Sequence, residues 1–269
     1  MRAYTYPYQD NDQPDHPFHT SITFDRILED YLFDRHLRLL IFDAIERIEI
    51  AFRTQVIHHY ALKYGSHWYE DKKLFKNEEC YIKDLQSIDS ELKRSVEVFI
   101  KHYRSTYSKP HRPPSWMTLE VISFGLLSKL FYNLKMCKEK KIVTGKFNLG
   151  HPYILQNWMH SLSYVRNICA HHSRLWNRRL TIAPKIPTYT RNPFIKNQSI
   201  DKHKLYLLLC CIAYLMDVIN PGHTFKSRLK ELIEKHPDLD IARMGFPGKW
   251  DEETLWITDP CYLSSSPKT

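Results

Sequence analysis

Glycine is scarce in this chain of 269 residues, which contains only seven. So few glycines exclude collagen-like chains, β-propellers and designs that depend on glycine-rich loops. Disorder is excluded too, because 43% of the residues are hydrophobic and only 26% are charged. We therefore expect a helical, globular protein that is long enough to bury a core in one large or two small domains.

Cysteines with a metal-binding or redox spacing are also missing. The six cysteines form no C-x-x-C pair and no zinc-like pattern, and Cys210 and Cys211 are adjacent inside an apolar run. We expect reduced, buried thiols and neither a metal nor another cofactor.

The chain lacks a long apolar run as well. Its longest, Leu205 to Met216, is shorter than the ~20 residues that a bilayer span requires. The first residues, Met1 to Tyr8, lack the apolar centre of a signal peptide. These absences predict a cytoplasmic protein with no membrane contact.

Acidic residues are outnumbered: 39 Lys and Arg stand against 30 Asp and Glu, which leaves a net charge of +9. A basic protein gains affinity for polyanions when it releases their counterions. The charge therefore favours RNA or another polyanion as a partner.

Two long stretches without glycine or proline predict the first helices. Residues Ile22 to Tyr64 contain neither and end at Gly65, which favours one long helix or two in line. Residues Asn77 to Tyr107 form a second such stretch, and Ser108 to Ser115, with three prolines, breaks it. This second stretch should be amphipathic, since apolar residues recur at steps of three and four at Tyr81, Leu85, Ile88, Leu92, Val96 and Phe99.

The rest of the chain reads as further helices and an irregular end. We expect helices from Trp116 to Leu134, from Pro152 to about Trp176 and, buried on all sides, from Lys204 to Ile219. Between them, Lys138 to Ile142 reads as a charged connector and Arg179 to Gln198 as a hairpin or an extended arm. The tail from Pro237 is irregular but aromatic enough to pack, and Leu263 to Thr269 should fray.

The densest set of polar functional groups lies between Tyr164 and Arg179, where sixteen residues include four arginines, two histidines and two asparagines. Arg166 and His171 form an R-x-x-x-x-H element. An imidazole moves protons near neutral pH and a guanidinium binds a phosphate through two donors. The pair therefore suits RNA cleavage by attack of a ribose 2′-hydroxyl on its own phosphate, with Asn167 placed to orient either group; such an internal nucleophile needs no cofactor.

The spacing alone is weak evidence. With 16 arginines and 15 histidines, about one such pair is expected by chance, and two occur. The second, Arg53 and His58, is kept in reserve, because Glu49 lies four residues before Arg53 and favours a salt-bridged helix face instead.

Helix geometry adds an expectation about assembly. Five residues turn a helix by about 140°, so Arg166 and His171 do not share one face. Two chains that pair about a two-fold axis would each contribute one Arg and one His to a groove. We therefore expect a homodimer with a composite active site.

Other interpretations of the same residues stay open. The segment can be a core or interface helix, and a metal site from Cys169, His171 and His172 is disfavoured because adjacent helical histidines point about 100° apart. A non-catalytic RNA-binding or toxin-regulating module is the main alternative, with bases stacked on Trp176 and Tyr189 and phosphates held by Arg178, Arg179, Lys185 and Lys138 to Lys141. A third is a protein-binding scaffold with an aromatic face of Trp116, Phe124, Phe131 and Tyr132, although such aromatics are more often core.

Four segments taken together resemble the bacterial abortive-infection (Abi) family, in its AbiD/AbiF-like group. They are Phe24 to Arg38, Ala44 to Thr54, Pro114 to Gly125 and Arg166 to Arg178. The resemblance implies an all-α fold with a HEPN-type ribonuclease core, similar to that of the type VI CRISPR ribonucleases, and a role in anti-phage defence. Members of the family carry an additional N-terminal segment before a tyrosine-rich stretch like Tyr4 to Tyr8, so we expect this chain to lack such a segment.

The resemblance also assigns roles. The HEPN signature falls on Arg166, Asn167 and His171 as catalytic residues. Its downstream part matches Arg174, Trp176, Asn177 and Arg178, as RNA-contacting or structural positions, and with His172 and Arg179 they form the expected RNA-binding set. The expected architecture is a HEPN-like helical bundle: an N-terminal region of long helices (1–110), the HEPN-like core (111–222), and a C-terminal helix with an irregular tail (223–269). RNA is the expected substrate, and a regulatory RNA or protein the expected switch.

Overall fold

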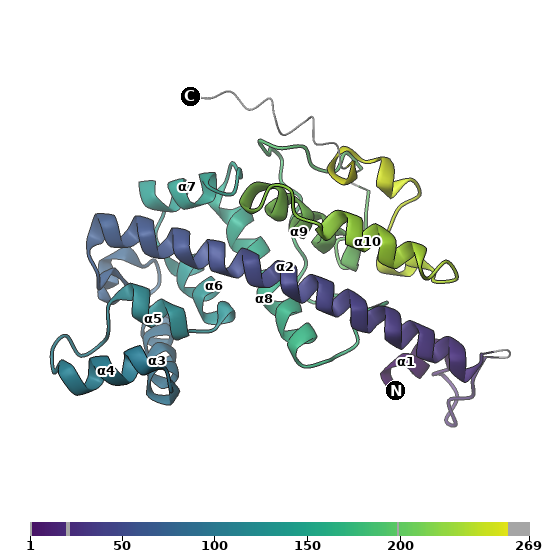
Figure 1. Cartoon of the computed structure of the whole chain (residues 1–269), viewed down its shortest axis with the longest axis horizontal. Helices are drawn as coiled ribbons and strands as arrows, with labels where there is room; N and C mark the ends of the chain where they lie inside the picture. The colour runs from purple at the N-terminus through teal and green to yellow at the C-terminus, as the bar shows by residue number, and fades with distance from the viewer. Residues whose placement is uncertain (1, 20–21, 198, 258–269) are drawn as a thin grey trace. The chain divides into compact units, whose positions relative to one another are not determined.

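The computed structural model describes residues 2–19, 22–197 and 199–257 (Figure 1). Within these ranges the secondary structure is entirely helical apart from three isolated β-bridges, which confirms the predicted all-α fold. The α-helices are α1 (Arg2–Thr5), α2 (Phe24–Tyr64), α3 (Glu78–Arg94), α4 (Val98–Thr106), α5 (Ser115–Val121), α6 (Phe124–Asn133), α7 (Lys138–Gly145), α8 (Pro152–Ala170), α9 (Leu205–Ile219) and α10 (Phe225–Glu234). The 3-10 helices are η1 (Tyr6–Tyr8), η2 (Trp68–Glu70), η3 (Lys72–Leu74), η4 (Ile241–Met244), η5 (Trp250–Glu252) and η6 (Thr254–Trp256).

The chain divides into two compact units. The first unit comprises the described residues of 1–46, 164–184 and 193–269, and the second comprises 47–163 and 185–192. The division falls inside α2 and inside α8, so each of these helices contributes to both units. No described helix has the length and apolarity needed to cross a membrane.

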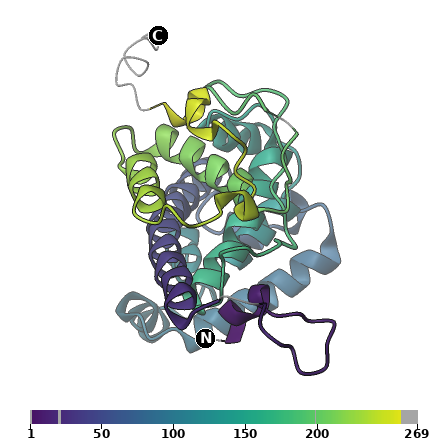
Figure 2. The same cartoon turned by 90° about the vertical axis from the view of Figure 1, so that its right-hand side faces the viewer.

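The core of the first unit is built around α9. Every residue from Leu205 to Met216 is buried, as its all-round apolar sequence predicts. The last 3-10 helix, η6, yellow in Figure 2, lies beside it, and the indole nitrogen of Trp256 donates to the hydroxyl of Tyr206 at 3.2 Å. Gly245, with φ +87°, lets this tail close over α9, because a Cβ there would lie 2.5 Å from that of Lys204. The expectation that the tail packs is confirmed, whereas Leu263 to Thr269 lie outside the described residues.

The core of the second unit collects aromatic rings around the C-terminal half of α2. The ring of Phe52 packs at an edge against Phe131, with centroids 5.0 Å apart, and lies close to those of Phe124 and Phe147. Of the four aromatics considered as a docking face, Phe124 and Phe131 are therefore core, whereas Trp116 and Tyr132 are exposed.

Two predicted helices are each interrupted. The stretch from Asn77 to Tyr107 forms α3 and α4, because Ser95 becomes extended and its hydroxyl accepts the N–H of Glu97 at 3.3 Å. Val96, predicted to face the core, is 72% exposed. The stretch from Trp116 to Leu134 forms α5 and α6, because Ile122 is extended and Ser123 caps α6 by accepting the N–H of Leu126.

The predicted connector from Lys138 to Ile142 is wrong, since these residues begin α7. Cys137 caps this helix through its sulfur, which accepts the N–H of Lys140 at 3.4 Å. The ammonium of Lys140 is buried and donates to the carbonyls of Leu134, at 2.6 Å, and Tyr132, at 3.3 Å. These carbonyls end α6 without helical partners, so the lysine ties α7 to α6.

The described cysteines are all free, and burial follows the prediction only in part. Cys169, Cys210 and Cys211 are buried, and burial raises the pKa of the Cys169 thiol to about 12, which keeps it protonated and unreactive. Cys80 is exposed and Cys137 half-buried. Cys261 lies outside the described residues.

The buried lysine leads to a pH-dependent prediction. Burial, together with the charge of Lys76, lowers the pKa of Lys140 from 10.5 to about 7 in the folded protein. Between these values the unfolded chain holds more protons, so the free energy of unfolding rises with pH. In Lys140→Met this contribution is absent, and the difference, wild type minus variant, should increase by at most about 1.4 kcal/mol per pH unit from about pH 7 to 10.

Urea unfolding at several pH values measures this difference. Lys141→Met, at an exposed neighbour on the same helix, is the control and should follow the wild type. A difference for Lys140→Met that does not change with pH would contradict the buried, neutralised lysine.

Candidate active site

The R-x-x-x-x-H element lies in the first unit, where α8 ends. The N–H of Ser173 donates to the carbonyl of Ile168 at 3.0 Å, and the N–H of His172 to that of Cys169 at 3.1 Å. This is a Schellman motif, with His172 in the left-handed conformation at φ +53° where glycine is usual. The motif ends α8 at Ala170, so the prediction of a helix to about Trp176 is wrong.

The three residues predicted to be catalytic lie at or just after this helix end. The side chains of Asn167 and His171 are exposed, and Arg166 is half-buried, with its guanidinium carbon 5.6 Å from the ring centroid of Phe42 on α2. In the described part of the chain, no hydrogen bond or ion pair engages the imidazole of His171, and none joins it to Arg166. The imidazole is therefore available to an outside molecule.

A buried carboxylate fixes the segment that follows. Asp34, in the middle of the first-unit part of α2, accepts the N–H of Trp176 at 2.6 Å and that of Leu175 at 3.2 Å. The same carboxylate accepts the hydroxyl of Tyr4 at 2.5 Å and pairs with buried Arg38. One side chain thus joins α2, the N-terminal segment and the loop after His171.

A second tyrosine repeats this arrangement one helical turn earlier. The hydroxyl of Tyr8 donates to Asp30 at 2.5 Å, and its ring stacks on Trp176 with centroids 6.3 Å apart. Trp176 is almost fully buried, so of the two roles expected for it, structural or RNA-contacting, the structure favours the structural one. Burial raises the pKa of both tyrosine hydroxyls, which stay protonated as donors.

The loop after His171 carries three arginines. Arg174 is half-buried; burial lowers its pKa, although the nearby Asp34 acts in the opposite direction, and its Nη1 has no partner among the described residues. Arg178 donates to the carbonyl of Arg174 at 3.1 Å, and Asn177, at φ +49°, accepts from Lys204 at 3.4 Å. Arg179 is exposed and pairs with Asp201 at 2.8 Å.

The pKa of Tyr164 is affected by the charge of this loop. Burial alone would raise the pKa of its hydroxyl, but a hydrogen bond to Thr181 and the positive charge of Arg178 lower it overall. The cation of Arg178 therefore favours the ionised form of this one hydroxyl.

The structure brings together most of the predicted site residues and adds three that sequence reasoning missed. The set lies at the end of α8 or in the next nine residues, with side chains exposed or half-buried: Arg166, Asn167, His171, His172, Arg174, Asn177, Arg178 and Arg179. The missed residues are Tyr4, Asp34 and Arg38, which support the loop. The signal for Asp34 and Arg38 was a charged pair four residues apart, inside the apolar stripe of Phe33, Leu37 and Ile41.

The second R-x-x-x-x-H pair, in the other unit, has a structural explanation. Arg53 is buried, pairs with Glu49 at 2.5 Å and donates two bonds of 3.1 Å to the carbonyl of Ile122. These bonds occupy its guanidinium on the helix face that the sequence suggested. His58 is exposed and packs against His59.

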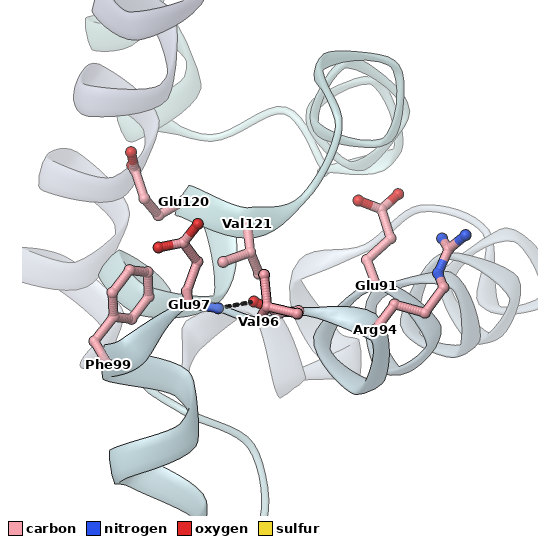
Figure 3. A pocket seen from close by; sticks show the side chains of 8 residues that line it. Glu91, Arg94, Val96, Glu97, Phe99, Glu120 and Val121 are labelled. Carbon is pink, nitrogen blue, oxygen red and sulfur yellow. Dashed lines mark hydrogen bonds between the residues drawn. The ribbon is translucent and has the colours of Figure 1, made fainter.

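A cleft of about 590 Å³ in the second unit has the opposite charge (Figure 3). Glu97 and Glu120 lie on one side of Val96 and Val121, and Glu91 and Arg94 on the other. Three carboxylates against one guanidinium make this cleft unsuited to phosphate. Nowhere in the described chain, this cleft included, does a group of three or more His, Cys, Asp or Glu side chains gather in a way that would hold a metal ion.

The protein is therefore all-α in its described residues and carries an R-x-x-x-x-H element where α8 ends. The loop after this element is held by the buried carboxylate of Asp34. A model of the Abi-like protein family matches residues 1–177, and the chain belongs to that family. The match includes Tyr4, Asp34 and the element itself. Neither a curated protein nor a solved structure matches the chain.

The bracing carboxylate leads to a stability prediction. Asp34→Ala leaves the buried guanidinium of Arg38 without its carboxylate partner and removes the acceptor of two backbone N–H groups, so the free energy of unfolding should fall by about 3–5 kcal/mol. Urea unfolding measures the loss. Asp25→Ala, at an exposed aspartate in the first turn of α2, is the control and should cost less than about 1 kcal/mol. Equal, small losses in both variants would show that Asp34 does not brace the loop.

Proposed function

We propose that this chain is an AbiD/AbiF-like abortive-infection protein, whose HEPN-type core cleaves RNA in the cytoplasm without a metal ion. The observation that carries the proposal is the position of His171. Its imidazole is exposed and unengaged by the described residues, at a helix end fixed by a Schellman motif. The arginine-rich loop that follows is held in place by Asp34.

The residues support a two-group mechanism. A ribose 2′-hydroxyl attacks the adjacent phosphorus and the P–O5′ bond breaks. If His171 is the base, its imidazole takes the hydroxyl proton and water protonates the departing 5′-oxygen; if it is the acid, water takes the hydroxyl proton and the imidazolium protonates the 5′-oxygen. Arg166, oriented by the ring of Phe42, stabilises the charge on the phosphoryl oxygens. The products are a 2′,3′-cyclic phosphate and a 5′-hydroxyl, so no external nucleophile or cofactor is consumed.

The loop residues contribute binding. Arg174 and Arg178 are half-buried and Arg179 is exposed, so all three arginines are at least partly open to solvent. Guanidinium groups of this kind pair with phosphate oxygens and position a strand without reading its sequence. His172, whose backbone ends the helix, keeps its ring exposed and is proposed to contact RNA as well.

A dimer completes the proposed site. Because no hydrogen bond or ion pair joins Arg166 to His171 within the described chain, we propose that the Arg of one chain acts with the His of a second copy. A regulatory RNA or protein that separates or masks these groups would then switch activity.

Cleavage tests the assignment of His171. Purified protein is incubated with labelled single-stranded RNA in excess EDTA, and the products are analysed for 2′,3′-cyclic phosphate ends. Wild type should cleave, and His171→Ala should lose cleavage by about 100-fold or more while its affinity for RNA changes by no more than a few-fold.

The matched control is His58→Ala, the histidine of the second R-x-x-x-x-H pair, which should cleave like the wild type. Equal cleavage by wild type and His171→Ala would refute the catalytic assignment. Binding without cleavage by the wild type would favour a non-catalytic RNA-binding module.

Mixed chains test the composite site. His171→Ala and Arg166→Ala should each be inactive alone, but after subunit exchange a mixture should recover part of the activity, because one of the two sites in a mixed dimer retains both groups. Exchange is verified with differently tagged chains. Verified exchange without recovered cleavage would show that each chain carries a self-contained site.

A further inference from the structure

One stretch of the chain contains no acidic residue at all. Between Glu139 and Asp201, the sequence has ten Lys and Arg and neither Asp nor Glu. The active-site loop accounts for only part of these cations. Others, including Lys185 and Arg191, lie in the second unit with residues 185–192, which return from the C-terminal half of the chain to α8.

Residues 185–192 are firmly attached to their unit at both ends. At one end, the N–H of Lys185 donates to the side chain of Asn157 at 2.6 Å, and the indole of Trp158 donates to the carbonyl of Lys185 at 2.8 Å. At the other end, Thr190 forms a β-bridge with Leu149, and the N–H of Arg191 donates to the carbonyl of Asn148 at 3.2 Å. The segment is therefore preorganised rather than a free arm.

This attachment gathers exposed rings and cations on one surface. Tyr153 is 44% exposed and Tyr189 64% exposed. The ammonium of Lys185 lies 5.6 Å from the ring centroid of Tyr153, and the ring of His151 lies 5.7 Å from the same centroid. Tyr189 packs beside Gly150, where an added Cβ would be 3.4 Å from its ring. We call His151, Tyr153, Lys185, Tyr189 and Arg191 the tyrosine platform.

We propose that the tyrosine platform binds single-stranded RNA, with unpaired bases stacked on Tyr153 and Tyr189 and phosphates held by Lys185 and Arg191. Rings held on a preorganised surface offer stacking at little entropic cost, and every unpaired base has a face to stack. Duplex RNA hides those faces within its own stack. The choice of RNA as the polyanion rests on the proposed function, whereas the stacking chemistry rests on the platform alone.

The glutamate-lined cleft lies in the same unit as the tyrosine platform but differs from it in charge. The cleft lined by Glu91, Glu97 and Glu120 also exposes apolar side chains, but its carboxylates would repel a phosphate backbone. The platform combines exposed rings with cations and has no carboxylate in its stretch of sequence. Charge and ring exposure together select the platform for a nucleic-acid strand.

Binding is measured with the full chain carrying His171→Ala, so that cleavage cannot alter the probe. The probes are a fluorescently labelled oligouridine and an abasic ribose-phosphate strand of the same length, followed by anisotropy. The parent should bind oligouridine at least tenfold more tightly than the abasic strand, because the two carry the same charge but only one carries bases. Tyr153→Ala with Tyr189→Ala should remove this preference and weaken oligouridine binding by about tenfold or more.

Two variants separate stacking from other effects. Tyr153→Phe with Tyr189→Phe should keep the affinity, because stacking needs the ring and not the hydroxyl. Tyr107→Ala, at a tyrosine 53% exposed at the end of α4, is the matched control and should bind like the parent. Lys185→Gln should reduce the salt dependence of log K by about 0.7.

Each outcome decides the proposal. Oligouridine affinity unchanged in the double alanine variant, no preference over the abasic strand, or no binding of any single strand would overturn it. Loss of the preference in the alanine variant and its retention in the phenylalanine variant would support it. Tyrosine-dependent binding in a protein that never cleaves RNA would leave the platform standing and refute the nuclease, whereas cleavage with tyrosine-independent binding would do the reverse.

Discussion

The arrangement of the loop after His171 depends on the hydrogen bonds that the carboxylate of Asp34 accepts. A fully buried carboxylate is costly to desolvate unless donors surround it, and here a tyrosine hydroxyl, a guanidinium and two backbone N–H groups do so. Those donors come from three separate parts of the chain. These hydrogen bonds offset the free-energy cost of burying the carboxylate. They also fix the loop after His171 against α2.

The backbone conformation at the end of α8 determines how His171 is exposed. A Schellman motif turns the chain away immediately after His171, which leaves its imidazole beyond the last helical turn. His172 holds the left-handed conformation that glycine adopts more readily. A non-glycine residue in this conformation carries a small strain that the surrounding hydrogen bonds must sustain.

Sequence reasoning predicted those elements that a local pattern specifies. The long α2 follows from 43 residues without glycine or proline, and α9 from an apolar run with no polar face. The breaks after Arg94 and at Ile122 were missed, because they depend on serine side chains that bond to the backbone, and an apolar period does not reveal such bonds. The end of α8 was missed because histidine, and not glycine, occupies the left-handed position.

The same distinction applies to the candidate site. Arg166, Asn167 and His171 are recognisable because they are close in sequence, whereas Tyr4 and Asp34 act through contacts that no local window contains. Their partners lie far along the chain, and the bonds from Asp34 to Leu175 and Trp176 join residues 141 and 142 positions apart. Family resemblance supplied the motif, and only the structure supplied its support.

These long separations also set an order of events during synthesis. The N-terminal half of α2 belongs to a unit that needs residues from 164 onward, so it leaves the ribosome well before its partners exist. The second unit, by contrast, is complete once residue 192 has emerged. Contacts between residues so far apart in the sequence form slowly. Until they form, the apolar stripe of Phe33, Leu37 and Ile41, which is buried in the folded protein, stays exposed to chaperones.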